Sequence, residues 1–310
     1  MCIIADNVKS VDNTNIAVFH IGYNLTGSVN DIIPGQLVIY SATVDSLANQ
    51  NAFILPVYNP SRKTDLIIPL DLSAQDDFFK VLNLIYDRWF PKRLTKSYSE
   101  SWDSTNGFEA QSYLPVHKVG DYKFSIMPHK SDFNRIDQSQ LYVNPTAKIS
   151  IDMHSDDYSF IVYQFYKRGK LEITPFGYIC PSYQSTNTLF VPTIHGHPHE
   201  MFSPAVYSHM KEGFEQKALY DHVIYAIVKC TETDKKNITP TKNDIVDLDH
   251  LLRKIKTDYL NRNIRIWLPK CFVPKKIDIK NHEPNRNFMI DLNQSDFLYD
   301  LTCDIKKIQY

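Results

Sequence analysis

Two features of the sequence carry residue types that can do chemistry: a cysteine at position 2 and a run of histidines at residues 195–199. If Met1 is removed, as is usual before a small second residue, Cys2 becomes the amino-terminal residue. Such a cysteine combines a nucleophile with a base, because its thiol can attack a carbonyl carbon while its α-amine, with a pKa of about 8, accepts the proton. The sequence therefore raises the hypothesis of an amino-terminal nucleophile.

The start of the chain is shared in part with known hydrolases that use this nucleophile. Class II glutamine amidotransferases and bile-salt-hydrolase-like enzymes also begin Met-Cys, and their cysteine opens a strand. Here Ile3 stands where the amidotransferases typically have glycine. Asn51, a polar residue that opens an apolar strand, is the candidate oxyanion donor. The alternative is that Cys2 is a small apolar residue at the start of a buried strand.

The histidine run His195-Gly196-His197-Pro198-His199 follows an expected strand. Alternate residues of an extended segment point the same way, so the three imidazoles could converge on zinc or another transition metal. However, glycine and proline interrupt the alternation, and no HExxH frame is present. Three interpretations stay open: a metal site at His195, His197 and His199, a general base for Cys2 at His195 or His197, or an exposed turn. Apart from such a metal, no cofactor is expected.

Composition and charge exclude several classes of partner. The net charge of the 310 residues is −1, which provides no field to hold duplex nucleic acid or an acidic membrane surface. No apolar run approaches the length of about 18 residues that a membrane-spanning helix needs. The five cysteines are odd in number and form no CxxC pair. Reduced thiols predict a soluble cytoplasmic protein, located in host cytoplasm or a virion if the chain is viral.

The aromatic content, with 19 Tyr and 17 Phe, favours a β-rich core, and the alternative is an aromatic recognition surface. Short apolar runs between turn residues predict strands, and two segments show helical spacing. The expected helices are Asp76–Trp89 and Asp244–Tyr259, and the expected strands are Cys2–Val11, Ile16–Tyr23, Gln36–Val44, Ala52–Val57, Leu66–Leu72 (an edge strand, because it contains Pro69), Leu189–Thr193 and His222–Cys230.

Two pairs of runs are predicted to form hairpins: Leu114–Val119 with Tyr122–Met127, and Tyr158–Tyr166 with Leu171–Ile179. Together these elements predict an α+β fold with a mostly antiparallel β-sheet core and two main helices. We expect a single globular unit over residues 1–275 and a peripheral C-terminal tail over residues 276–310.

Several segments resemble an uncharacterised Met-Cys-initiated protein family with bacterial, amoebal and large-DNA-virus members. The resemblance spans roughly residues 1–230 and implies that these segments act as one unit, but it brings no known activity. The segments that carry it are Met1-Cys2, Asn51-Ala52-Phe53-Ile54-Leu55-Pro56, Val116-His117-Lys118-Val119-Gly120-Asp121-Tyr122, Leu189-Phe190-Val191-Pro192-Thr193-Ile194-His195-Gly196-His197 and Tyr220-Asp221-His222-Val223-Ile224-Tyr225.

Two functional hypotheses follow, and they imply different partners. The first is a Cys/His-dependent, amidase-like hydrolase that acts on a small amide or ester, with Cys2 as nucleophile. Its base would be the α-amine of Cys2 or else His195 or His197, and Asn51 would be the oxyanion donor. The alternative is a non-enzymatic protein-interaction or scaffold protein with an aromatic-rich β surface. A small-molecule substrate and a protein partner thus both remain open at the level of sequence.

Overall fold

Three sheets and the helices beside them account for the part of the chain that the structure describes. The structure is a computed structural model, and it describes residues 3–25, 30–89, 114–182, 188–192, 222–229, 248, 250–252, 265–267, 272–279, 288–291 and 297–299.

The largest sheet is built on three long antiparallel strands, β2 (Val8–Asn24), β3 (Ile33–Ser46) and β9 (Gly169–Pro181). These strands are rich in β-branched and aromatic residues, which fit a pleated surface that is buried on both sides. The strand order is β13-β11-β2-β3-β9-β5, and β12 also pairs with β2. The added strands are β5 (Ile68–Leu70), β11 (His222–Lys229), β12 (Arg265–Trp267) and β13 (Phe272–Ile279).

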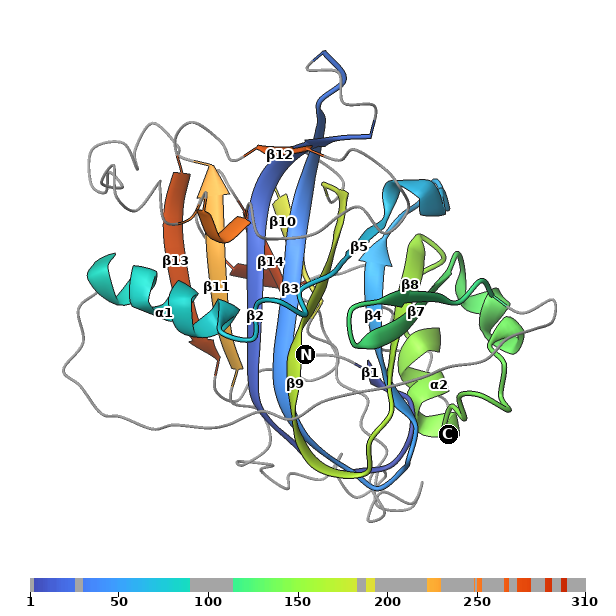
Figure 1. Cartoon of the computed structure of the whole chain (residues 1–310). Helices are drawn as coiled ribbons and strands as arrows, with labels where there is room; N and C mark the ends of the chain where they lie inside the picture. The colour runs from blue at the N-terminus through green and yellow to red at the C-terminus, as the bar shows by residue number, and fades with distance from the viewer. Residues whose placement is uncertain are drawn as a thin grey trace.

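A five-stranded antiparallel sheet, in the order β1-β4-β8-β7-β6, packs against the first one (Figure 1). A third sheet, in the order β10-β14-β15, completes the described strands. Their bounds are β1 Ile3–Ile4, β4 Asn51–Tyr58, β6 His117–Val119, β7 Tyr122–Met127, β8 Tyr158–Phe165, β10 Thr188–Val191, β14 Phe288–Asp291 and β15 Phe297–Tyr299.

Aromatic side chains fill the space between the two large sheets. Phe176 of β9 contacts Phe53 of β4 at 4.9 Å between ring centroids and Tyr163 of β8 at 4.8 Å. The Tyr163 hydroxyl donates to the carbonyl oxygen of Gly177, so one hydrogen bond crosses directly from sheet to sheet. Most of the large fully buried side chains are Tyr or Phe. Among the described residues, most of the large aromatic side chains therefore serve the core.

Helices cover the outer faces of both sheets. Helix α1 (Phe78–Trp89) packs on the larger sheet together with Leu248, Leu251 and Leu252. The other sheet is covered by α2 (Pro145–Asp152) and by the chain before it, which includes the 3₁₀ helix η2 (Lys130–Arg135). A second 3₁₀ helix, η1 (Thr64–Leu66), precedes β5. The described chain is thus a two-sheet sandwich with a helix on each side.

The predicted α+β class with a mostly antiparallel core is confirmed, and β2 with β11 is the parallel exception among the described ladders. The first expected helix is present as α1, and β5 pairs with β9 as the edge strand that Pro69 indicated. Of the second expected helix, Leu248 and residues 250–252 lie in the described part and are helical. The β6–β7 hairpin is also confirmed, with Gly120 at the turn at φ 56°.

The expected hairpin of Tyr158–Tyr166 with Leu171–Ile179 is wrong. Strand β8 pairs with β4 and β7, whereas β9 pairs with β3 and β5, so the two strands lie in different sheets. The turn residues between them correctly indicate a reversal of the chain. A reversal of the chain does not determine which strands form hydrogen bonds with each other. Here β8 and β9 pack face to face across the sandwich, as Tyr163 and Phe176 do, and form no backbone ladder.

Two other parts of the chain differ from the expected pattern. Strand β2 runs through the turn expected near Asn13, because a register shift and a left-handed backbone at Asn13 (φ 51°) absorb the polar residues. The expected boundary between residues 275 and 276 falls inside β13. Beyond it, β14 pairs with β10 and β15 pairs with β14, so these parts of the expected tail join a sheet. No helix in the described residues is long and apolar enough to cross a membrane.

Candidate functional site

The residues expected to do chemistry divide between described and undescribed parts of the chain. Cys2, His195, His197 and His199 lie outside the described residues, so their hypothesised nucleophile, base and metal-ligand roles stay predictions. Within the described ranges, no group of three or more His, Cys, Asp or Glu side chains is arranged to hold a metal ion.

Asn51, the candidate oxyanion donor, begins β4 and is fully buried. Its carboxamide oxygen accepts from the backbone N–H groups of Asp6 and Ala52, each at 2.9 Å. Its amide nitrogen donates to the Asp6 carbonyl at 3.1 Å and to the Ser46 hydroxyl at 3.3 Å. Both amide hydrogens are therefore in use, and a catalytic role would require these bonds to be exchanged for substrate. The bonds tie the chain after β1 to β4.

Cys180 is the described free cysteine, and it lies in the core of the sandwich on β9. Burial raises the pKa of its thiol far above the ordinary value, and a hydrogen bond involving Gln36 offsets this only in part. Because the thiolate is the reactive form, Cys180 is a structural residue and not a nucleophile.

The described hollow with the clearest binding chemistry lies beside α1, and we call it the α1 groove. Asp77, Val81, Leu84 and Arg88 follow one another at spacings of four, three and four residues, so they form one stripe along the helix. This stripe is adjacent to the face that packs on the sheet. The groove has a volume of about 420 Å³ and is lined by Gln75, Asp77, Val81, Leu84, Ile85, Arg88, His250 and Leu251.

Leu84 gives the groove an apolar rim. Its side chain is 58% exposed, although α1 already buries Phe78, Leu82 and Ile85 on the sheet. Val81 is half-buried against the same cluster, and Leu251 forms part of the opposite wall. Apolar side chains thus line part of a concave surface that has opposite charges at its two ends, Asp77 just before α1 and Arg88 in the last turn of α1.

Gln75 is the unusual polar residue of the α1 groove. Its backbone N–H donates to Leu72, and its carbonyl accepts from Phe78, so the turn into α1 holds the residue in place. The side chain is 1% exposed, yet neither its amide nitrogen nor its carbonyl oxygen has a hydrogen-bond partner in the described part of the chain. An unsatisfied buried polar group costs about 1–3 kcal/mol. Gln75 therefore carries a cost that the described part of the chain does not offset.

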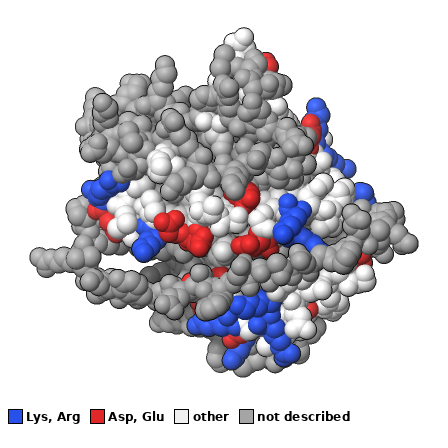
Figure 2. Space-filling model, in the orientation of Figure 1, with Lys and Arg blue, Asp and Glu red and all other residues white. Residues whose placement is uncertain are grey.

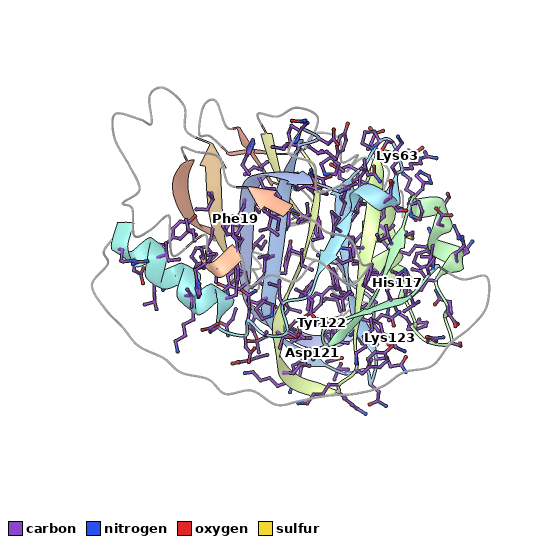
Figure 3. All side chains as sticks on the ribbon, turned by 45° about the horizontal axis from the view of Figure 1, so that its top comes forward. Phe19, Lys63, His117, Asp121, Tyr122 and Lys123 are labelled. Atoms are coloured by element: carbon purple, nitrogen blue, oxygen red, sulfur yellow. The ribbon has the colours of Figure 1, made fainter. Side chains whose placement is uncertain are left out.

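A second surface lies around the β6–β7 hairpin, where Figure 3 shows His117, Asp121, Tyr122 and Lys123 close together. The His117 ring stacks on Phe124 at 5.2 Å, and Lys123 lies 5.2 Å from the ring centroid of Tyr166. The Tyr122 hydroxyl contacts Thr174 of β9, and burial raises the pKa of that hydroxyl far above its ordinary value. The Tyr122–Thr174 contact joins the hairpin to the larger sheet, and the other two contacts hold side chains of the hairpin in place.

Charge on the visible face of the molecule is local. Figure 2 shows Lys and Arg side chains gathered at one end, over the connection between β8 and β9, where Lys167, Arg168 and Lys170 are exposed. Acidic groups lie among them, for example Asp45 at 3.9 Å from the Lys9 ammonium. Such a mixture fits the near-zero net charge and offers no extended basic track for a polyanion.

The α1 groove was missed at the level of sequence. The helical pattern assigned Phe78, Leu82, Ile85 and Trp89 to the buried face and left Leu84 outside it. An additional leucine off the buried stripe is a signal that could have been noticed. Nothing in the sequence distinguishes Gln75 from an exposed residue before a helix, because its burial depends on the packing around the turn.

Comparison with known proteins gives no family assignment, since no protein-family model matches the chain. Among solved structures, baculovirus P35 is similar at 14% identity and a TM-score of 0.38, over 98% of this chain and 95% of that chain. A mutated baculovirus P35 after caspase cleavage is similar at 12% identity and a TM-score of 0.36, over 94% and 95%. Likeness at this level does not establish a shared fold, so function is argued below from the residues of the chain itself.

Proposed function

We propose that this chain is a non-enzymatic protein-interaction protein and that the α1 groove is its contact surface. The observation that carries the proposal is the exposed Leu84 at the rim of a groove of about 420 Å³. An exposed leucine on its own is ordinary, but one that borders a concave apolar surface is the arrangement of a binding site.

The dimensions and chemistry of the groove support this proposal. Its volume lies in the range of about 300–1,000 Å³ that is typical of ligand sites, at the lower end. Its lining combines four aliphatic side chains with four polar or charged ones, Gln75, Asp77, Arg88 and His250, so an apolar contact area lies beside groups that can fix the orientation of a ligand. A groove of this size accommodates one or two side chains of a partner, which then act as anchors.

The hydrolase hypothesis keeps the status of a prediction, because its nucleophile and its base lie outside the described residues. Its one described member, Asn51, uses its amide hydrogens on Asp6 and Ser46. The interaction hypothesis instead rests on side chains whose positions and exposure the structure describes, above all Leu84. For this reason it is the function that the described geometry supports better.

Binding of selected peptides tests the proposal. A random peptide library is selected against the full immobilised chain, and the recovered peptides are titrated against wild type, Leu84→Asp and Ile149→Asp. Ile149 is the matched control, since it is also an exposed aliphatic residue on a helix, α2, at 43% exposure. We expect the Leu84→Asp variant to bind about tenfold or more weakly, because a charge in an apolar anchor site costs more than 1.4 kcal/mol.

The control variant should bind as wild type does. Equal binding by Leu84→Asp and wild type, or failure of any peptide to enrich, would overturn the proposal. Thermal denaturation of both variants verifies that they fold, and because both replaced side chains are exposed we expect only small changes in stability.

A further inference from the structure

We infer that the α1 groove recognises the peptide backbone of an extended partner segment, and that Gln75 makes that contact. The inference rests on the proposed function, since it names the chemistry by which the groove would bind a protein.

The chain itself shows how a buried carboxamide holds extended backbone. Gln36 of β3 is 1% exposed, and its amide nitrogen donates to the Phe190 carbonyl at 3.0 Å. The Phe190 N–H donates to the Gln36 carboxamide oxygen at 2.8 Å. Asn51 forms the same two-bond pair with the N–H and carbonyl of Asp6. In each case a planar carboxamide offers one donor and one acceptor to the acceptor and donor of a single residue's backbone.

Gln75 is buried to the same extent as Gln36 and carries the same group, but its amide nitrogen and carbonyl oxygen lack partners in the described chain. It also lines the α1 groove, whereas Gln36 lies between the strands of the sandwich. The matching ligand is therefore a peptide group that enters from outside, with an N–H for the carboxamide oxygen and a carbonyl for the amide nitrogen. An extended segment is required, because helices use these backbone groups internally.

The walls specify the side chains beside that peptide group. Val81, Leu84 and Leu251 are aliphatic, so an aliphatic residue of the partner fits between them. Asp77 lies close to Gln75 in the chain, and Arg88 lies eleven residues further along the stripe. At about 1.5 Å per helical residue this separation is about 16 Å, which corresponds to about five residues of extended chain. The inferred ligand is a segment of about five residues with a basic residue near the Asp77 end and an aliphatic residue at the centre.

Backbone methylation tests the inference with peptides recovered by selection on the full chain. Each peptide is synthesised with one N-methyl amide at a time, which removes a single N–H and keeps every side chain. We expect one position at which methylation weakens binding to wild type about tenfold or more. The same methylation should change binding to Gln75→Met less than twofold, because the partner of that N–H is already gone. Gln138→Met, in the connection between η2 and α2, is the matched control and should behave as wild type.

The outcomes separate this inference from the proposed function. If Leu84→Asp abolishes binding while no methylation effect depends on Gln75, the groove binds protein but not through Gln75, and the inference fails alone. If neither Leu84→Asp nor Gln75→Met alters binding, both fail. A second copy of the chain as occupant would appear as a dimer in light scattering that Leu84→Asp dissolves, and that result would also overturn the inference.

Discussion

Gln36 and Gln75 are two glutamines with the same 1% exposure and opposite surroundings. Gln36 lies between strands, where folding brings the backbone of Phe190 onto both ends of its carboxamide. Gln75 lies at the turn into α1, where folding buries it without a partner among the described residues. Burial alone therefore does not define the role of a polar side chain. What matters is whether the same fold that removes water also supplies hydrogen bonds.

The contrast extends to the two regions that contain these residues. The sandwich uses side chains to hold backbone across sheets, as Tyr163 does with Gly177 and Tyr178 does with Pro56 at 3.4 Å. The α1 groove is closed on one side by the helix and remains accessible on the other, with Leu84 at its rim. We interpret the sandwich as the stable framework and the α1 groove as the region kept available for a partner.

The largest effect is expected when the framework glutamine loses its carboxamide. Gln36→Met retains length and removes both hydrogen bonds to Phe190, which leaves a buried N–H and a buried carbonyl unpaired. The free energy of unfolding should fall by about 2–4 kcal/mol. Urea denaturation followed by circular dichroism measures the change, and a loss below about 0.5 kcal/mol would contradict the assigned role.

A smaller loss is expected at Asn51. Asn51→Ala removes four hydrogen bonds, two of which join β4 to Asp6 in the chain after β1, but Asp6 lies at a half-buried position where water can replace part of them. We expect a loss of about 1–3 kcal/mol in the same denaturation measurement. Unchanged stability would instead indicate that the amide is available for another task, such as the hypothesised oxyanion contact.

Gln75→Met should not lower the free energy of unfolding, in contrast to Gln36→Met. The substitution removes a buried carboxamide that has no partner in the described chain and replaces it by an apolar side chain of similar length. We expect the free energy of unfolding of the unliganded chain to stay equal or rise by up to about 1 kcal/mol. A loss comparable to that of Gln36→Met would show that Gln75 already has a partner within the fold.

The smallest effect on stability is expected at an exposed charge cluster near α2, formed by His129, Lys130 and Asp156. It lies outside both the sandwich core and the α1 groove. The Lys130 ammonium, 2.9 Å from the Asp156 carboxylate, holds the pKa of Asp156 below its ordinary value, and His129 adds to this. Since the folded pKa is lowered, the contribution to stability is present above the ordinary pKa and is lost as pH falls through the folded one. Asp156→Asn should remove this acid dependence and lower the midpoint at neutral pH only slightly, because an exposed ion pair contributes little.

Denaturation curves of wild type and Asp156→Asn between about pH 6 and about pH 3 measure that difference. A stability difference that is present at about pH 6 and vanishes as the pH falls to about 3 would support the assignment. A difference of the same size at both ends of that pH range would contradict it.

Local pattern was enough to predict much of the fold. Helical spacing over Asp76–Trp89 predicted α1, and the paired runs Leu114–Val119 and Tyr122–Met127 predicted the β6–β7 hairpin. The same kind of signal predicted a hairpin of β8 with β9, and this was wrong because the partner of a strand depends on distant segments. Of the candidate site residues, Asn51 is described, and three of its four hydrogen bonds involve Asp6 and Ser46, which no local pattern identifies.

The sequence alone determined the properties that follow from local pattern or from composition. These are the periodicity of the strands and the helix, the near-zero net charge and the β-rich, aromatic core. The tertiary structure decided which strands share a sheet and which polar groups find partners. Gln36 and Gln75 look alike in the sequence, since each is a glutamine near apolar residues. They differ only because folding brings Phe190 to one and not to the other, a contact across 154 positions of the chain. Hydrogen bonds between residues so far apart form only in the packed molecule. The candidate binding site is marked by Gln75, which lacks such bonds in the described part of the chain.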